Sequence, residues 1–187
     1  MTNKELLNIK NNIILYTAIP VLLKAGFTMS PFSTACNGRN NLNDFSYELC
    51  RIVPGSILEI IEIYVSRDDR WIQFHLNIFK LTPGVESIAQ LNNIDGLEYK
   101  LPPNSITEMR LRSDDIKGIP LFRLSYMNGH KLRRFYTKAG LKRNVTRLTK
   151  TVHSDMVNIE RFVKRLHQLH HPTKTSWTGH PMAADLS

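Results

Sequence analysis

Residues 130–150 bring together side chains whose chemistry suits anion binding, with eight lysines and arginines and no acidic residue. The rest of the chain carries seventeen basic and sixteen acidic residues, so this window holds eight of the nine net positive charges. A solvated helix face ordinarily mixes the two signs, because opposite charges four residues apart stabilise a helix and like charges destabilise it. The window therefore predicts a polyanion-binding surface, with an ordinary solvent-exposed face as the alternative. The predicted contacts are Lys131, Arg133, Arg134, Lys138, Lys142, Arg143, Arg147 and Lys150.

Aromatic side chains are sparse in this window, where Phe135 and Tyr136 are the only rings. Proteins that read single-stranded nucleic acid stack successive bases on several aromatic side chains. Contact with phosphates or lipid headgroups therefore fits the composition better than base stacking.

Three histidines near the C-terminus have spacing that would let them share a metal on a helix: His167, His170 and His171. A zinc site needs a fourth ligand, and no carboxylate or thiol lies near them in the sequence. Histidines are also favourable at a helix C-terminus for electrostatic reasons. We therefore predict no metal site and no cofactor.

Two aspartate pairs, in "RDDR" at 67–70 and "SDDIKG" at 113–118, are the remaining candidates for catalytic chemistry. Paired carboxylates can hold Mg²⁺ in a nuclease, but aspartate is equally a turn residue, and both pairs lie where turns are expected. The chain lacks the common nucleophile-elbow, P-loop, zincin and dinucleotide-binding motifs. We predict a non-enzymatic protein, leaving a metal-dependent nuclease that uses Asp68, Asp69 or Asp114 as the enzyme hypothesis.

The composition is typical of a single folded domain, and the net charge favours acidic partners. The 187 residues are 42% hydrophobic and 22% charged, which excludes wholesale disorder and leaves room for one sizeable core. The isoelectric point of about 9.7 favours nucleic acid, anionic lipid or an acidic protein as partner. Cys36 and Cys50 form no CxxC motif, so we interpret them as free thiols in a reducing compartment, although a disulfide stays open.

The N-terminal region predicts a helix over 3–25, with apolar residues at helical spacing, a kink at Pro20 and a stop at Gly26. Its apolar run at 13–23 has about the length of a signal-peptide core, but Glu5 and Pro20 argue against that interpretation. The run is shorter than the about 20 apolar residues that span a bilayer. We therefore expect a buried amphipathic helix in an intracellular protein, cytoplasmic or nuclear.

An antiparallel meander is predicted next. Alternating apolar residues indicate half-buried strands at 44–53, 56–66 and 71–81, joined by turns at Pro54-Gly55 and 67–70. After a loop-rich region with a short helix around 85–91 and a short strand within "ITEMRLR", Asn128-Gly129 predicts a two-residue type I′ hairpin. In that register Phe122 would face Phe135, and Arg123 would face Arg134.

After Gly140 the apolar period becomes that of a helix. The stripe runs at steps of three and four residues from 141 to 170 and predicts one helix, or two helices broken near Ser154. The β-branched residues at 145–152 favour a break or a frayed start. From Pro172 the periodicity ends, so we predict a single domain over 1–171 and a mobile tail over 172–187.

The fold predicted is therefore α+β: an N-terminal helix, an antiparallel meander with an Asn-Gly hairpin, and a basic amphipathic C-terminal helical region. The leading functional hypothesis is a binding or structural protein that docks on nucleic acid or nucleoprotein. The alternatives are a matrix-type peripheral membrane scaffold, possibly viral, on anionic lipid, and a regulatory or toxin-neutralising module that covers an acidic protein. Each of them requires that Arg134 and Arg147 lie on one continuous surface.

Overall fold

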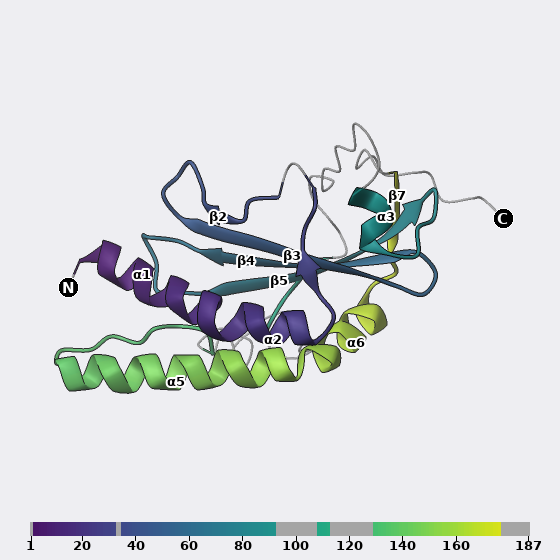
Figure 1. Ribbon diagram of the computed structural model, residues 1–187. Coiled ribbons are helices and arrows are strands. Elements are labelled where there is room, and N and C mark those ends of the chain that lie inside the picture. The colour runs from purple at the N-terminus through teal and green to yellow at the C-terminus, as the bar shows by residue number, and fades with distance from the viewer. Residues whose placement is uncertain (1, 33–34, 93–107, 113–128, 177–187) are drawn as a thin grey trace.

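The chain begins with a helical segment whose conformation changes before a proline (Figure 1). The computed structural model describes residues 2–32, 35–92, 108–112 and 129–176. Helix α1 (Asn3–Ile13) continues through the π-helical turn η1 (Ile14–Ala18) into α2 (Ile19–Lys24), which confirms the predicted helix. Pro20 has no N–H to donate to the carbonyl four residues back, and the Ile19 N–H instead reaches the Ile14 carbonyl five residues back. The proline thus coincides with a widened turn.

The sheet is mostly antiparallel and contains the predicted meander. Tyr47 on the first meander strand lies opposite Ile63 on the second, and Ile63 lies opposite Phe74 on the third. A one-residue slip would move all three side chains to the other face, so burial of this face determines the register. The meander strands are β3 (Phe45–Val53), β4 (Ile57–Val65) and β5 (Gln73–Thr82), and the added strands are β1 (Thr28–Met29), β2 (Gly38–Arg39), β6 (Met109–Arg110) and β7 (Thr173–Ser176).

One face of the sheet is covered by a helical layer in which α1, α2, α5 (Lys138–Val157) and α6 (Ile159–Leu169) pack together (Figure 1). Helix α5 starts three residues earlier than expected, because the Thr137 hydroxyl caps it by accepting the Gly140 N–H at 3.0 Å. The interruption expected near Ser154 lies at Asn158 instead, with φ −100° and ψ 24°. Burial of Leu148 and Val152 keeps the first half helical despite its β-branched residues.

The opposite face of the sheet is divided in two. One half is apolar, with Phe79 and Leu81 among its buried side chains, and it is covered by α3 (Ile88–Asn92) and by Phe32. The other half carries polar side chains of β3, β4 and β5, including Glu48. The helical layer therefore leaves a polar area of sheet on the far side.

The structure bears on two of the C-terminal predictions, the Asn128-Gly129 hairpin and the mobile tail. The first arm of the Asn128-Gly129 hairpin, with Phe122 and Arg123, lies outside the described residues. Its second arm is not a regular strand: it makes a single bridge, from Lys131 to Trp71, and then turns onto α5. The tail expected to be mobile from Pro172 contributes four residues to the sheet, because β7 pairs in parallel with β5.

The helical segment Asn3–Lys24 is long and apolar enough by composition to cross a membrane, and no other helix of the described residues is. Core helices pass the same test, and 44% of the apolar 18-residue window of this segment is buried inside the protein. Its Lys10 and Asn11 are bonded to the sheet and its turns, with Asn11 accepting from the Tyr47 hydroxyl at 2.7 Å. Membrane insertion would break both bonds, so the evidence for a span is weak.

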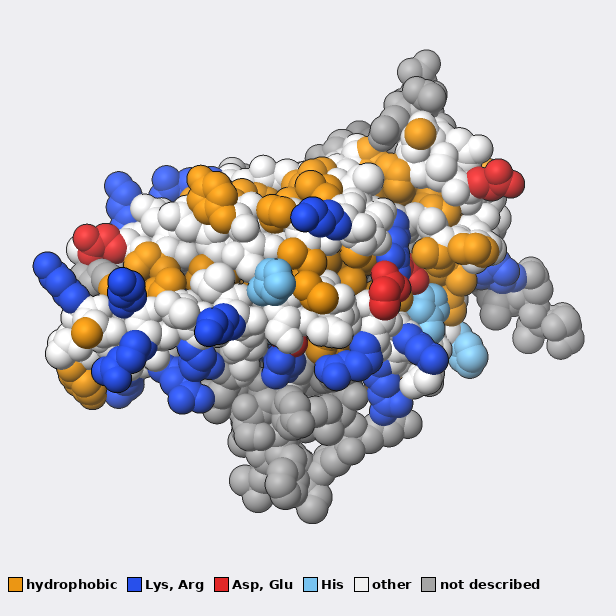
Figure 2. All heavy atoms as spheres, turned by 60° about the horizontal axis from the view of Figure 1, so that its bottom comes forward, with side chains coloured by type: hydrophobic (Ala, Val, Ile, Leu, Met, Phe, Trp, Pro, Cys, Tyr) orange, Lys and Arg blue, Asp and Glu red, His pale blue; other side chains and the backbone are white. Residues whose placement is uncertain are grey.

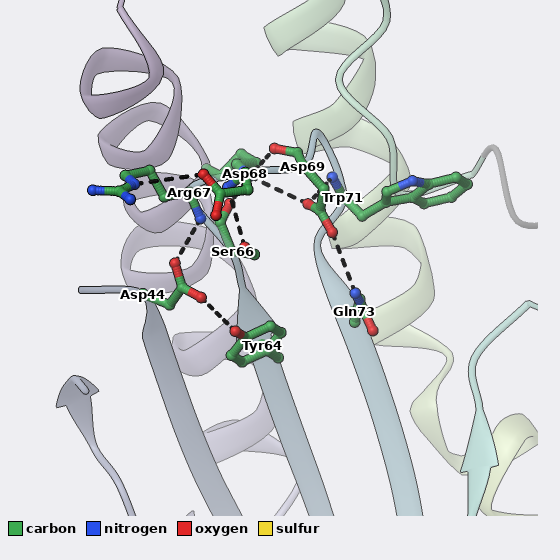
Figure 3. A network of polar contacts seen from close by, with 9 residues as sticks. Asp44, Tyr64, Ser66, Arg67, Asp68, Asp69, Trp71 and Gln73 are labelled. Atoms are coloured by element: carbon green, nitrogen blue, oxygen red, sulfur yellow. Dashed lines mark hydrogen bonds and ion pairs between the residues drawn. The ribbon is translucent and has the colours of Figure 1, made fainter. Parts of the chain in front are cut away.

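The turn between β4 and β5 is held by a polar network (Figure 3). Asp44 accepts bonds from the Tyr64 hydroxyl and, at 2.7 Å, from the Arg67 N–H. Asp69 accepts the Trp71 N–H at 2.7 Å, as expected of a turn residue. Beneath the turn lies Lys10, whose side chain is fully buried.

The Lys10 ammonium joins α1 to this turn. Its Nζ donates to the carbonyls of Ser66 and Asp69 at 2.5 and 2.7 Å and lies 3.6 Å from the Asp69 carboxylate. Burial lowers the Lys10 pKa, while the Asp69 charge acts in the opposite direction. A buried ammonium is tolerated here because carbonyl oxygens and a carboxylate surround it.

Replacing Lys10 with Met is expected to lower the free energy of unfolding by about 2 kcal/mol, because two carbonyls lose their donor. Urea unfolding followed by circular dichroism measures this change. Lys4, exposed on the same helix, is the matched control, and Lys4→Met is expected to change stability by less than about 0.5 kcal/mol. Equal stability of Lys10→Met and wild type would show that the ammonium does not hold the turn.

Candidate functional site

The two halves of the basic window lie side by side. The extended segment at 131–134 runs along α5, and the guanidinium of Arg147 donates to the Lys131 carbonyl at 2.6 Å. The Asn144 side-chain amide donates to the carbonyls of Arg133 and Arg134 at 3.3 and 3.2 Å. Segment and helix therefore form one continuous surface, which we call the basic surface: residues 131–134 and the outer face of α5 from Lys138 to Lys150.

Most of the predicted contacts on this surface are available to a ligand. Figure 2 shows lysines and arginines gathered over the helical layer, with few acidic side chains among them. Lys131 is half-buried, with its Nζ 4.6 Å from the centre of the Trp71 ring. The exposed members are Arg133, Arg134, Lys138, Lys142, Arg143 and Lys150.

Arg147 differs from its neighbours because it is used inside the fold. Part of its guanidinium donates to the Lys131 carbonyl, and its Nε is buried with no hydrogen-bond partner among the described residues. Burial lowers the Arg147 pKa, and the nearby charge of Arg133 adds to the effect. Its role as a polyanion contact stays a prediction, while its structural role is to hold the extended segment on α5.

The acidic residues of the two C-terminal helices are occupied by other partners. Asp155 is buried, and Glu160 binds the Arg51 guanidinium with two bonds of 2.6 and 2.9 Å. Neither carboxylate neutralises the exposed lysines and arginines of α5. The positive charge continues past the basic surface through Arg161 and Lys164 of α6, both of which are exposed.

A hollow on α5 is lined by cationic and hydroxyl side chains that lie on the same face of the helix. The Thr151 hydroxyl is used internally, since it donates to the Arg147 carbonyl at 3.0 Å, whereas Thr146 is exposed. Phosphate oxygens accept bonds from such ammonium, guanidinium and hydroxyl groups. The described residues that line the hollow are Lys142, Arg143, Thr146, Arg147, Lys150 and Thr151.

A buried charge cluster anchors the basic surface to the core. Asp155 of α5 accepts from His130 Nε2 at 2.6 Å and from Arg112 at both of its oxygens. The edge of the His130 ring packs against Phe74, with ring centres 4.9 Å apart. Desolvation acts to raise the Asp155 pKa, but the bonds and charges of His130 and Arg112 outweigh it and the pKa is lowered. Burial lowers the pKa of His130.

Sequence reasoning missed this cluster. It assigned His130 to a hairpin strand of the basic window and gave Asp155 and Arg112 no role. One signal was present: Asp155 is the single acidic residue between 130 and 159. A lone acid in a basic run is a candidate for a buried ion pair.

Three of the residues considered for metal chemistry, His167, Asp68 and Asp69, bind other partners. His167 binds the Glu59 carboxylate at 2.8 Å. Within the described ranges no three His, Cys, Asp or Glu side chains are grouped to hold a metal ion. Asp69 serves Lys10 and its own turn, and Asp68 lies 3.6 Å from the Arg67 guanidinium. Asp114 lies outside the described residues, so the nuclease hypothesis stays untested.

Comparison with protein families, with curated proteins and with solved structures finds no match to this chain. Its function therefore has to be inferred from its own residues.

Acidification is expected to destabilise the fold through the anchor cluster. The His130 pKa in the folded state lies below the ordinary 6.5, so below pH 6.5 the unfolded chain binds a proton that the folded chain resists. The contribution of His130 to the free energy of unfolding is therefore fully present above pH 6.5, and it declines as the pH falls below that value. Asp155, with its pKa held below 3.8, adds a second decline below about pH 4.

Urea unfolding at a series of pH values between 7.5 and 5 measures this decline. His130→Gln is expected to flatten it, because glutamine does not titrate. His153→Gln, on the exposed side of α5, is the matched control and should leave the decline unchanged. An equal decline in the His130 variant would assign the pH dependence to other groups.

Proposed function

We propose that this chain is a non-enzymatic binding protein that docks on the phosphates of nucleic acid or nucleoprotein through the basic surface. The observation that carries the proposal is the packing of residues 131–134 against α5 by Asn144 and Arg147. This packing combines two short groups of cations into one surface. Like charges held this close repel one another, and a bound polyanion relieves that repulsion.

Affinity is expected to come from charge more than from base identity. Tyr136 is 95% exposed beside the basic surface and offers one ring for stacking. Phe135 is half-buried under the Arg70 guanidinium, 5.6 Å from its ring centre. Proteins that bind single strands by stacking use several rings along the groove. The proposed ligand contact is therefore with the phosphate backbone and has little sequence preference.

Binding to nucleic acid is expected to weaken steeply as salt rises. In a plot of log affinity against log salt concentration, each lost phosphate contact on duplex DNA reduces the slope by about 0.9. Replacing both Lys142 and Arg143 with Gln is therefore expected to reduce it by about 2. Fluorescence anisotropy with a labelled duplex at several salt concentrations measures the slope.

Lys80→Gln is the matched control, because Lys80 is exposed on β5 away from α5. It is expected to leave the slope unchanged. A wild-type affinity that does not depend on salt would contradict the proposal. Equal slopes in the double variant and wild type would place the contact elsewhere on the chain.

A second candidate, docking on an anionic membrane surface, is favoured by apolar side chains beside the cations. Tyr16 and Leu23 on η1 and α2 are 78% and 46% exposed. Tyr16 lines a hollow together with Lys24 and Lys150. Apolar side chains flanked by lysines are typical of surfaces that lie on acidic lipid. For an acidic protein partner, no described feature adds to the charge argument, and it stays a prediction.

Flotation with lipid vesicles separates the two candidates. If the membrane surface is the partner, the protein floats with vesicles rich in phosphatidylserine and stays behind with phosphatidylcholine alone. The Tyr16→Ser, Leu23→Ser double variant should then lose flotation while keeping its affinity for the labelled duplex. Thr17→Ser on the same helical segment is the matched control. Absence of flotation on acidic vesicles would remove this candidate.

A further inference from the structure

The polar half of the far sheet face carries a row of titratable side chains across three strands. In the strand register Glu48 lies opposite Glu62, and Glu62 lies opposite His75. Glu108, just before β6, binds the His75 ring through Nδ1. These four side chains line a pocket of about 490 Å³ on the side of the sheet away from α5. The other described lining residues are Cys36, Ser46, Tyr47, Ile63, Tyr64 and Gln73.

Two of these carboxylates lack donors that they could use within the described residues. Glu48 is 9% exposed and is hydrogen-bonded to the Ser30 side chain, but its Oε1 is buried with no hydrogen-bond partner. Glu62 makes no hydrogen bond or ion pair in the described part of the chain. Like charges directly opposite each other destabilise a strand pair, and a buried acceptor without a donor costs further stability. Such an arrangement needs a compensating donor.

We propose that this pocket binds the ammonium or guanidinium group of an organic cation, with Glu48 and Glu62 as its charged acceptors. The proposal concerns the face opposite the basic surface and does not depend on the proposed function. An ammonium or guanidinium supplies the donors that Glu48 Oε1 and Glu62 lack, in charge-assisted bonds. The Tyr64 ring lines the same pocket, and aromatic rings attract cations. No described group has the arrangement of a metal site, which favours an organic cation.

Without a bound cation, Glu48 and Glu62 are expected to have pKa values above that of an ordinary glutamate. Burial raises the pKa of Glu48, and burial with the charges of Glu48 and Glu108 raises that of Glu62, against an opposing effect of His75. Cation binding favours the ionised carboxylates, so it should release protons to the buffer. The titratable and charged groups that face the pair are Cys36, Tyr64, His75, Glu108 and, in register with His75, Arg110.

Isothermal titration with spermidine, and separately with a capped peptide carrying one arginine, tests the proposal and separates a free polyamine from a protein side chain. Saturable binding is expected in at least one of the two titrations. Glu48→Gln and Glu62→Gln keep side-chain shape and remove charge, and each is expected to weaken binding about tenfold or more. Glu86→Gln, an exposed carboxylate outside the pocket, is the matched control and should bind like wild type.

A measurement on the wild-type protein makes the test independent of the variants' folding. Cys36 lines the pocket and is partly exposed, whereas Cys50 is fully buried and burial raises its pKa to about 12. Iodoacetamide should therefore alkylate Cys36 alone, and saturating spermidine or peptide should slow that reaction several-fold. Tetramethylammonium chloride at equal ionic strength controls for salt, because that ion has no donors.

Four outcomes would overturn the proposal. The first is the absence of saturable binding by both spermidine and the arginine peptide. The second is binding that the Glu48 and Glu62 variants leave unchanged, since the cation would then lie elsewhere. The third is tighter binding of MgCl₂ or CaCl₂ than of either organic cation, which would make the pocket a metal site. Undiminished alkylation of Cys36 at saturation would exclude this pocket as well.

Discussion

The buried carboxylate of Asp155 is the interaction on which the arrangement of the basic surface depends. It belongs to α5, and it accepts hydrogen bonds from His130, just before the extended segment, and from Arg112, two residues after β6. Three pieces of chain that are distant in sequence therefore meet at one charge. Removal of any partner would leave a buried charge uncompensated, which costs far more than the loss of an exposed pair. The His130 bond brings the start of the segment at 131–134 to α5, where Asn144 and Arg147 bind its carbonyls.

The alternation of side chains along the strands places the two candidate sites on opposite faces. The helices take the apolar side chains of one sheet face, so the basic face of α5 points away from the sheet. On the other face, alternate residues of the same strands bring Glu48, Glu62 and His75 into line. A protein with nine net positive charges thus places three glutamates, Glu48, Glu62 and Glu108, in a pocket on the sheet face opposite α5. Such separation of charge suits the binding of two ligands of opposite sign.

Local patterns predicted the elements well and their ends poorly. The meander, the N-terminal helix and the C-terminal helical region follow from period-two and period-3.6 burial, which is a property of the chain itself. The strand β7 and the bridge at Lys131 were missed because each is a few residues long and exists only where β5 or Trp71 offers a partner. The break at Asn158 was placed four residues early because serine and asparagine are about equally good N-cap residues, so the sequence did not distinguish Ser154 from Asn158.

For the candidate sites the sequence identified residue types, and tertiary contacts decided their use. The sequence showed eight cations in one window. It did not show that Arg147 bonds inward to the Lys131 carbonyl or that Lys142 is exposed. The row of Glu48, Glu62 and His75 has no signature in the sequence, because its members are 13 or 14 residues apart and meet through strand register alone.

By itself, then, the sequence determined the fold class, the positions of the main helices and strands, and the excess positive charge near the C-terminus. Each of these depends on composition or on side-chain period within one segment. Only the tertiary structure decided that the two basic segments form one surface, and that Glu48 and Glu62, which are not fully satisfied by the described residues, share a pocket on the other face. Both depend on contacts between segments far apart in sequence, which hydrogen bonds, buried charge and strand register specify together.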